Sequence, residues 1–320
     1  MTRADAAAVP ERLLTANDVA VAAQVACLLE VSAPKPGNVS PGRHFVDLRY
    51  EDFLVSAVAI GEPLAGAGTR PLGATIRLAI EATARWTRTN TNLGIVLLLA
   101  PLAKAALREN GVGGHLKRTP AAEAPRVSSL NDLRPHLSQV LDTTTVDDAR
   151  DVYAAIRLAS PGGLGHAESQ DVAAEPTVTL LEAMRLAAHR DGVAREYATT
   201  FETTFGIAVP VLEQARRDGL PWDDAVVETF LQLLAHAPDT HIARRGGDAV
   251  ARAVFDHAQR AVAAGGMRSA AGRGLVDEMD RRMRDERNLR NPGTTADLTA
   301  AAIFVVLLRG GLGGAYAGSR

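Results

Sequence analysis

The stretch LGIVLLLAPLA, residues 93–103, is the most apolar part of the chain and decides its fold. A helix that is apolar on every face must be buried, so residues 93–107 are predicted to form a central core helix. Pro101 should kink this helix inside the core. The apolar run of eleven residues is too short to cross a bilayer, and no membrane partner is predicted.

Apolar residues recur at three- and four-residue steps on both sides of this stretch, which is the period of an amphipathic helix. No segment alternates as a strand does, and no repeat is present. The chain is therefore predicted to be all-α: one multi-helix globular domain over 17–310, with a disordered or loosely ordered N-terminus (1–16) and a flexible C-terminal tail (311–320). About a dozen helices are expected, at 17–30, 50–66, 71–86, 93–107, 131–141, 146–158, 177–190, 194–218, 221–235, 248–264, 275–284 and 295–309.

The composition excludes several classes of protein. Hydrophobic residues make up 47% of the 320, but aromatic residues only 4%, which favours packed helices over β-rich cores. A net charge of −2 lacks the basic excess of a nucleic-acid-binding protein. Cys27 is the one cysteine, so an internal disulfide and a thiolate metal cluster are excluded. No signal peptide is recognisable, and we expect a cytoplasmic protein.

Five loops carry more chemistry than helix connections require. In the first, Pro34 and Pro36 flank Lys35 and prevent a helix, which gives a stiff, extended segment. Thr and Asn residues elsewhere can be helix caps, and Gly pairs can be C-caps. The loops and their polar residues are 33–47 (Lys35, Asn38, Arg43, His44, Asp47), 87–94 (Asn90, Asn92), 160–168 (Gly163, His166), 238–247 (Asp239, His241, Arg245) and 288–297 (Thr294, Thr295, Asp297).

Together these loops are typical of a polyphosphate site. Helix N-termini offer N–H donors to phosphate oxygens, and loop cations add positive charge. Carboxylates in loops are suitable ligands for Mg²⁺. No common phosphate-binding or zinc motif is present. Predicted phosphate or substrate contacts are Lys35, Asn38, Arg43, Asn90, Asn92, Gly163, His166, His241, Arg245, Thr294 and Thr295, and predicted metal ligands are Asp47, Asp239, Asp280 and Asp297.

The order of these blocks resembles the triphosphoribosyl-dephospho-CoA synthase family over about residues 20–308. The resemblance rests on 34–37 (PKPG), 42–47, 52–56, 90–94 (NTNLG), 239–247 and 292–298 (PGTTADL). It implies an all-helical enzyme that uses ATP as a substrate with Mg²⁺. The ribose 2′-hydroxyl of 3′-dephospho-CoA would attack C1′ of the ATP ribose, and adenine would leave. The expected partners are small molecules, and a homodimer is expected.

The sequence departs from the family pattern at the predicted ligand. A His-Lys pair of the family is replaced by Asn92 and Leu93, and Asp-Thr-Asn becomes Asp239, Thr240 and His241. In the third block His166 replaces a residue of the family's Arg-Gly-Glu motif. The chain therefore resembles a divergent member, and its acceptor is left open.

For the chemistry, His44 is the first choice for proton transfer, with His166 and His241 next. Asp47 and Asp239 are expected to act at the metal and triphosphate. Two alternatives stay open on the sequence: a metal-dependent helical hydrolase of a nucleotide or ribosyl phosphate, and a non-catalytic nucleotide-binding protein.

Overall fold

The computed structural model describes residues 14–107, 133–285, 287–310 and 312. Every regular element among them is helical, and the one β interaction there is an isolated bridge between Ser40 and Arg43. The all-α prediction is confirmed. Most of both predicted tails lies outside the described residues, so those tails stay predictions.

The helices keep the chain order in which periodicity predicted them. The first half contributes α1 (Ala16–Ser32), α2 (Tyr50–Ala59), α3 (Gly61–Ala65), α4 (Leu72–Ala84), α5 (Leu93–Ala106), α6 (Leu133–Asp142) and α7 (Val146–Ala159). The second half contributes α8 (Leu180–Ala187), α9 (Gly192–Ala198), the π-helix η2 (Thr204–Ala208), α10 (Val209–Arg217), α11 (Trp222–His236), α12 (Thr240–Gly246), α13 (Asp248–Ala263), the 3₁₀ turn η3 (Gly266–Arg268), α14 (Ala270–Met283) and α15 (Gly293–Gly310).

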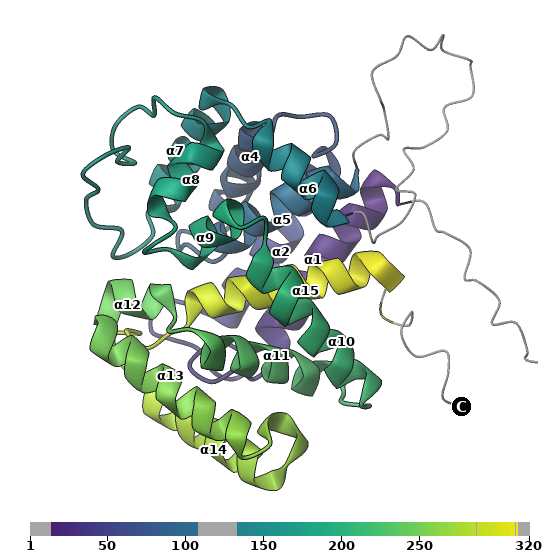
Figure 1. Cartoon of the computed structure of the whole chain (residues 1–320), viewed down its shortest axis with the longest axis vertical. Coiled ribbons are helices and arrows are strands. Elements are labelled where there is room, and N and C mark those ends of the chain that lie inside the picture. Colours follow the sequence, from purple (N-terminus) through teal and green to yellow (C-terminus); the bar gives the residue numbers. More distant parts are fainter. Residues whose placement is uncertain (1–13, 108–132, 286, 311, 313–320) are drawn as a thin grey trace, which may run out of the picture.

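Helix α15 is the centre of the packing. It crosses the middle of the molecule, with α4 and α6–α9 on one side of it and α11–α14 on the other (Figure 1). It contacts α1, α5, α10 and α11. By length and composition α15 could cross a membrane, but 72% of its apolar window is buried inside the protein. Its apolar character is therefore explained by the core, which it shares with the predicted central helix α5.

One predicted helix is wrong. Residues 194–218 do not form a single helix, because Thr200 and Phe201 adopt the left-handed region, with φ of 52° and 57°. Bulky residues rarely adopt that region. The chain turns there and restarts as η2 and α10. The apolar period runs through this break, so periodicity alone could not show it.

Smaller differences follow from capping. The predicted loop 238–247 contains α12, which begins because Asp239 caps it. The predicted helix over 50–66 is interrupted at Ile60. Helix α1 begins one residue before the predicted 17, at Ala16, because Thr15 is its N-cap and Asp18 completes a capping box with it.

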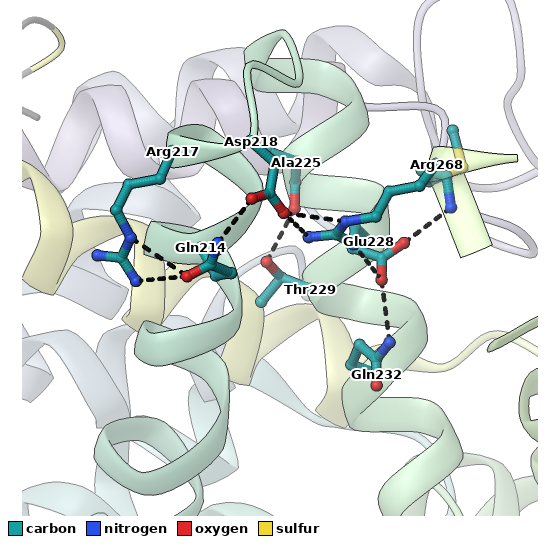
Figure 2. Close-up of polar contacts among 9 residues, drawn as sticks. Gln214, Arg217, Asp218, Ala225, Glu228, Thr229, Gln232 and Arg268 are labelled. Carbon is teal, nitrogen blue, oxygen red and sulfur yellow. Dashed lines mark hydrogen bonds and ion pairs between the residues drawn. The ribbon is translucent and has the colours of Figure 1, made fainter. Parts of the chain in front are cut away.

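The buried carboxylate of Glu228 connects α11 to the turn between α13 and α14 (Figure 2). Glu228 on α11 is only 2% exposed. It pairs with Arg268 at 2.8 Å and accepts hydrogen bonds from the amide of Met267 at 2.8 Å and from Gln232 at 2.9 Å. Arg268 also reaches Asp218 at 2.8 Å. The turn between α13 and α14 is thereby attached to α11.

We predict that Glu228→Ala lowers the free energy of unfolding by about 1–3 kcal/mol, because it leaves the buried Met267 amide without an acceptor. Urea unfolding followed by circular dichroism measures this. Asp218→Ala is the matched control: it removes the exposed partner of the same arginine and should cost clearly less. Equal losses for the two variants would contradict the assignment.

Candidate active site

Lys35 lies inside the protein at the start of the first loop. Its side chain is fully buried and its ammonium pairs with Glu30 at 3.0 Å. It also donates to the carbonyls of Glu30 and Ala33. Burial lowers the pKa of Lys35, and the charge of Glu30 opposes this. All three ammonium donors are therefore occupied within the protein, and Lys35 holds the loop against the end of α1.

Asp280 fastens the same loop to α14. Its carboxylate accepts hydrogen bonds from the Gly37 amide at 2.9 Å and from Arg43 at 3.2 Å. Arg284 donates to both oxygens, at 2.7 and 3.0 Å. Gly37 has φ +76°, and a Cβ there would lie 2.7 Å from Met283 Cε, so this position requires glycine. Asp280, a predicted metal ligand, has both oxygens occupied by protein donors.

Asp239 joins α12 to α15. One of its oxygens accepts from the Ile242 amide at 2.9 Å, and the other accepts from the amide and hydroxyl of Thr295, each at 2.7 Å. The carboxylate is 3% exposed. Burial raises the pKa of Asp239, and these hydrogen bonds oppose the rise. Next to it, the hydroxyls of Thr240 and Thr294 are 3.1 Å apart.

The second loop places the start of α5 against the start of α15. Asn90 accepts a hydrogen bond from the Leu93 amide at 3.1 Å, and Asn92 donates to Thr83 at 3.0 Å. A Cβ on Gly94 would lie 2.0 Å from the carboxylate of Asp297. Only glycine allows this close approach, so the glycine at position 94 is explained by contact with an acid from the far end of the chain.

These loops enclose a cavity of about 90 Å³, which we call the Asp297 cavity. Polar side chains from four parts of the chain line it, and they include five residues that the sequence predicted and three that it missed. The predicted residues are Asn38, Asn90, Asn92, His241 and Asp297, and the missed ones are Glu30, Thr91 and Asn291. Sequence reasoning passed over Glu30 because it sits on an apolar helix, although an acid in the turn before Lys35 was a usable signal.

Three polar groups of this cavity lack partners among the described residues. Asp297 makes no hydrogen bond or ion pair there, and the buried Oδ1 of Asn38 and Nε2 of His241 make none either. Asn38 uses its Nδ2 on Asn291, at 2.6 Å. Buried polar groups are normally satisfied, so three unpartnered groups around one cavity indicate a ligand.

The charges around Asp297 favour its protonated form. Burial raises the pKa of Asp297 well above its ordinary value, and the negative charge of Glu30 adds to the effect. More distant charges of Asp239 and Asp191 act in the same direction, and Arg244 opposes them. Asp297 is thus a carboxyl group that holds a proton more readily than an ordinary aspartate does.

The remaining predicted residues lie outside the cavity. His44 and Asp47 are exposed on the first loop, where Asp47 accepts a hydrogen bond from Asn288 at 3.0 Å. His166 is largely exposed and pairs with Asp171 at 3.1 Å. Arg245 donates to the carbonyl of Asn288 at 3.3 Å.

Gly163 is packed against α12, because a Cβ on it would lie 3.1 Å from the Arg244 carbonyl. The third loop therefore covers α12 without lining the Asp297 cavity. Arg43, on the first loop, also lies outside this cavity and is 43% exposed beside Asp280.

The four predicted metal ligands do not form a cluster. Among the residues that the structure describes, no group of three or more His, Cys, Asp or Glu side chains could hold a metal ion. Asp239 and Asp280 are occupied by protein donors, Asp47 is at the surface, and Asp297 lies in the cavity.

We predict that His241 stays neutral throughout the physiological range. Burial, followed by the positive charges of Arg244 and Arg245, lowers the pKa of His241 to about 3. The unfolded chain, with an ordinary His pKa, binds the proton more readily, so this residue destabilises the fold as pH falls from about 6.5 toward 3. NMR titration of the ring should show no protonation between pH 5 and 8. His241→Asn should reduce the loss of stability at low pH, and an ordinary titration midpoint would contradict the prediction.

Comparisons with known proteins show which family the chain resembles. A 2-(5″-triphosphoribosyl)-3′-dephosphocoenzyme-A synthase of Pectobacterium atrosepticum is 39% identical over 67 residues, which is 21% of this chain and 22% of that protein. A probable enzyme of the same name from Pectobacterium carotovorum is 41% identical over 56 residues, 18% of this chain and 19% of the relative. The matched segments span about a fifth of these curated relatives.

A crystal structure from Archaeoglobus fulgidus, named as a triphosphoribosyl-dephospho-CoA synthase, shares the fold with a TM-score of 0.59 and 24% identity. The match covers 81% of this chain and 99% of that one. The family model described as CitG, ATP:dephospho-CoA triphosphoribosyl transferase, matches residues 16–315. The chain therefore belongs to the CitG family of ATP:dephospho-CoA triphosphoribosyl transferases.

Proposed function

We propose that this chain transfers the triphosphoribosyl group of ATP to a hydroxyl group of 3′-dephospho-CoA or a closely similar acceptor. The observation that carries the proposal is the Asp297 cavity: three polar groups without partners, on loops that belong to the family's motifs, face one space. Family membership supports the class of reaction, and the unpartnered polar groups of the cavity support its choice as the reaction site.

The reaction is a substitution at an anomeric carbon. The acceptor's hydroxyl oxygen forms a bond to C1′ of the ATP ribose, and the bond from C1′ to the adenine N9 breaks. The electron pair of that bond leaves with adenine, which gains one proton, while the hydroxyl loses one. The triphosphate stays on the transferred ribose. Such reactions pass through an oxocarbenium-like state, which a neighbouring carboxylate stabilises.

Asp297 is the residue best placed for proton transfer. In its charged form it can take the proton of the attacking hydroxyl, and its raised pKa makes it a stronger base than an ordinary carboxylate. The Nδ1 of neutral His241 accepts from Arg244, so its free Nε2–H can donate a hydrogen bond to a ribose oxygen, and the Oδ1 of Asn38 can accept one from a ribose hydroxyl. In this proposal Asp239 positions Thr295 and α15, and His44 stays at the rim.

The triphosphate would extend from the small cavity toward the surface. The residues on that side are Arg43 and Asp47, both exposed, with Arg245 nearby on Asn288. Mg²⁺ commonly uses one or two carboxylates together with phosphate oxygens and water. Asp47, which uses one oxygen on Asn288, fits such a role better than the fully occupied Asp239 and Asp280. When bound, Mg²⁺ would neutralise phosphate charge. Cytoplasmic location and a homodimer stay predictions.

We predict that Asp297→Asn lowers kcat for adenine release by ~10²–10⁴-fold, because the amide cannot accept the proton. Chromatography of ATP, Mg²⁺ and dephospho-CoA mixtures measures adenine and the conjugate. Asp256→Asn, an exposed acid on α13, is the matched control and should leave the rate unchanged.

The products also separate the alternatives. Adenine with free ribose triphosphate and no conjugate would mean hydrolysis, and ATP binding without adenine would mean a non-catalytic protein. Either result contradicts the transferase proposal.

We predict that EDTA abolishes adenine release and that Mg²⁺ restores it. Asp47→Asn should raise the Mg²⁺ concentration needed for half-maximal rate, because one carboxylate ligand is lost. The saturating rate should change little. Full activity in EDTA would contradict the metal requirement, and an unchanged Mg²⁺ dependence in the variant would remove Asp47 from it.

A further inference from the structure

A second cavity lies on the opposite face of the first turns of α12 and α15. It has a volume of about 420 Å³, which is large enough for a nucleoside-sized group. Its lining is mixed: one arginine, the acids Glu202 and Asp239, His236 and several threonines stand beside the apolar side chains of Ile207, Leu233 and Leu298. The residues that matter here are Arg195, Thr199, Gly206, Ile207, Leu233 and Leu298.

One helical turn separates the two cavities. Thr294, Thr295 and Leu298 face the second cavity, whereas Gly293 and Asp297 face the first. This division follows from the three- and four-residue period of α15. The two spaces are therefore neighbours across a wall only one backbone segment thick.

The wall is rigid at its base and reaches solvent at its edge. Asp239 and Thr295 are buried and hydrogen-bonded, which fixes the base. Thr240, His241 and Gly293 are only partly buried, so the edge of the wall is accessible.

The far side of the second cavity is built at an energetic cost. Thr200 and Phe201 adopt the left-handed region, which is unfavourable for residues other than glycine, and a π-helix follows them. Buried Glu196 stabilises the turn by accepting hydrogen bonds from the amides of Thr203 and Thr204, at 3.1 and 2.9 Å. Strained turns and π-helices concentrate at functional sites.

A second contact holds the turn from outside: Arg134 on α6 donates to the carbonyl of Thr200 at 2.9 Å. A simple continuous helix, which the sequence pattern would allow, would leave no such concave surface. The strain therefore has a structural result, which is the cavity itself.

The chemistry of the cavity suits a phosphorylated heterocycle. Arg195 uses Nε on the Ala188 carbonyl at 3.2 Å, and its terminal nitrogens have no acceptor among the residues described. Ile207, Leu233 and Leu298 offer flat apolar contact. A cation beside apolar walls fits an anionic group attached to a base.

We propose that the second cavity binds the nucleotide portion of the acceptor, with a phosphate on Arg195 and the base against the apolar wall. This rests on the proposed function, because a reaction between two nucleotides needs two subsites. The Asp297 cavity, at about 90 Å³, cannot hold both. The acceptor's ribose then reaches the Asp297 cavity over the edge of the wall.

Gly206 allows a direct test. It lines the second cavity, and a Cβ on it would meet nothing within 4 Å. Gly206→Leu therefore introduces its Cβ without a close contact and adds a bulky side chain at the cavity lining. Gly274 on α14 has equally open space and lies outside the cavity, so Gly274→Leu is the matched control.

Calorimetry with dephospho-CoA and, separately, with ATP measures the result. We expect Gly206→Leu to weaken dephospho-CoA binding by at least about tenfold and to leave ATP binding unchanged, because only one subsite is filled. Gly274→Leu should change neither. Unchanged dephospho-CoA affinity in Gly206→Leu, equal loss of both ligands, or no binding of dephospho-CoA to the wild type overturns the proposal.

The Arg195→Gln variant tests the proposed phosphate contact in the same cavity. It should weaken dephospho-CoA by about tenfold but leave adenosine, which has no phosphate, unaffected. Equal effects on both ligands overturn the assignment of Arg195. If Gly206→Leu behaves as expected while the wild type releases no adenine, the proposed reaction fails and the binding site stands.

Discussion

The carboxylate of Asp239 is the constraint on which the rest of the site depends. It is buried, it caps α12, and it receives the amide and hydroxyl of Thr295 from the first turn of α15. These bonds join two helix starts that are more than fifty residues apart in the chain. Without them the wall between the two cavities would have no fixed position, and neither cavity would keep its shape. A buried acid that satisfies several donors is stable only while all of them are present.

The other acids divide into those that build the site and one that is left for chemistry. Asp280 holds the first loop, Glu30 holds Lys35, and Glu196 and Glu228 hold tight turns. Asp297 holds no other element in place: among the described residues it makes no hydrogen bond or ion pair, and it lines the cavity. Because it is buried and also lies close to like charges, its ionisation is costly, and a ligand that changes either condition would change its protonation. The same residue type thus acts as a fastener or as a reactive group, depending on whether donors reach its oxygens.

Much of the fold could be predicted because apolar residues recur along the core helices at steps of three and four residues. The segment 93–107 and the C-terminal helix were both recognisable from apolar residues alone, and the structure places them side by side. The break at Thr200 could not be predicted, because its cause is the carboxylate of Glu196 and the guanidinium of Arg134, which no local pattern reveals. Five predicted residues do line the Asp297 cavity. The roles of the rest depend on which donors surround them, and a sequence does not show that.

The sequence by itself determined that the chain is helical, that its loops carry the polar chemistry, and which family those loops resemble, since composition, period and short motifs are local properties. Only the tertiary structure decided that Lys35 faces inward to Glu30, that Gly94 makes room for Asp297, and that the first turn of α15 has a cavity on each face. These outcomes depend on distances between residues far apart in the chain. Such distances are set by how whole helices pack, because a side chain's partner is chosen by space and not by sequence order.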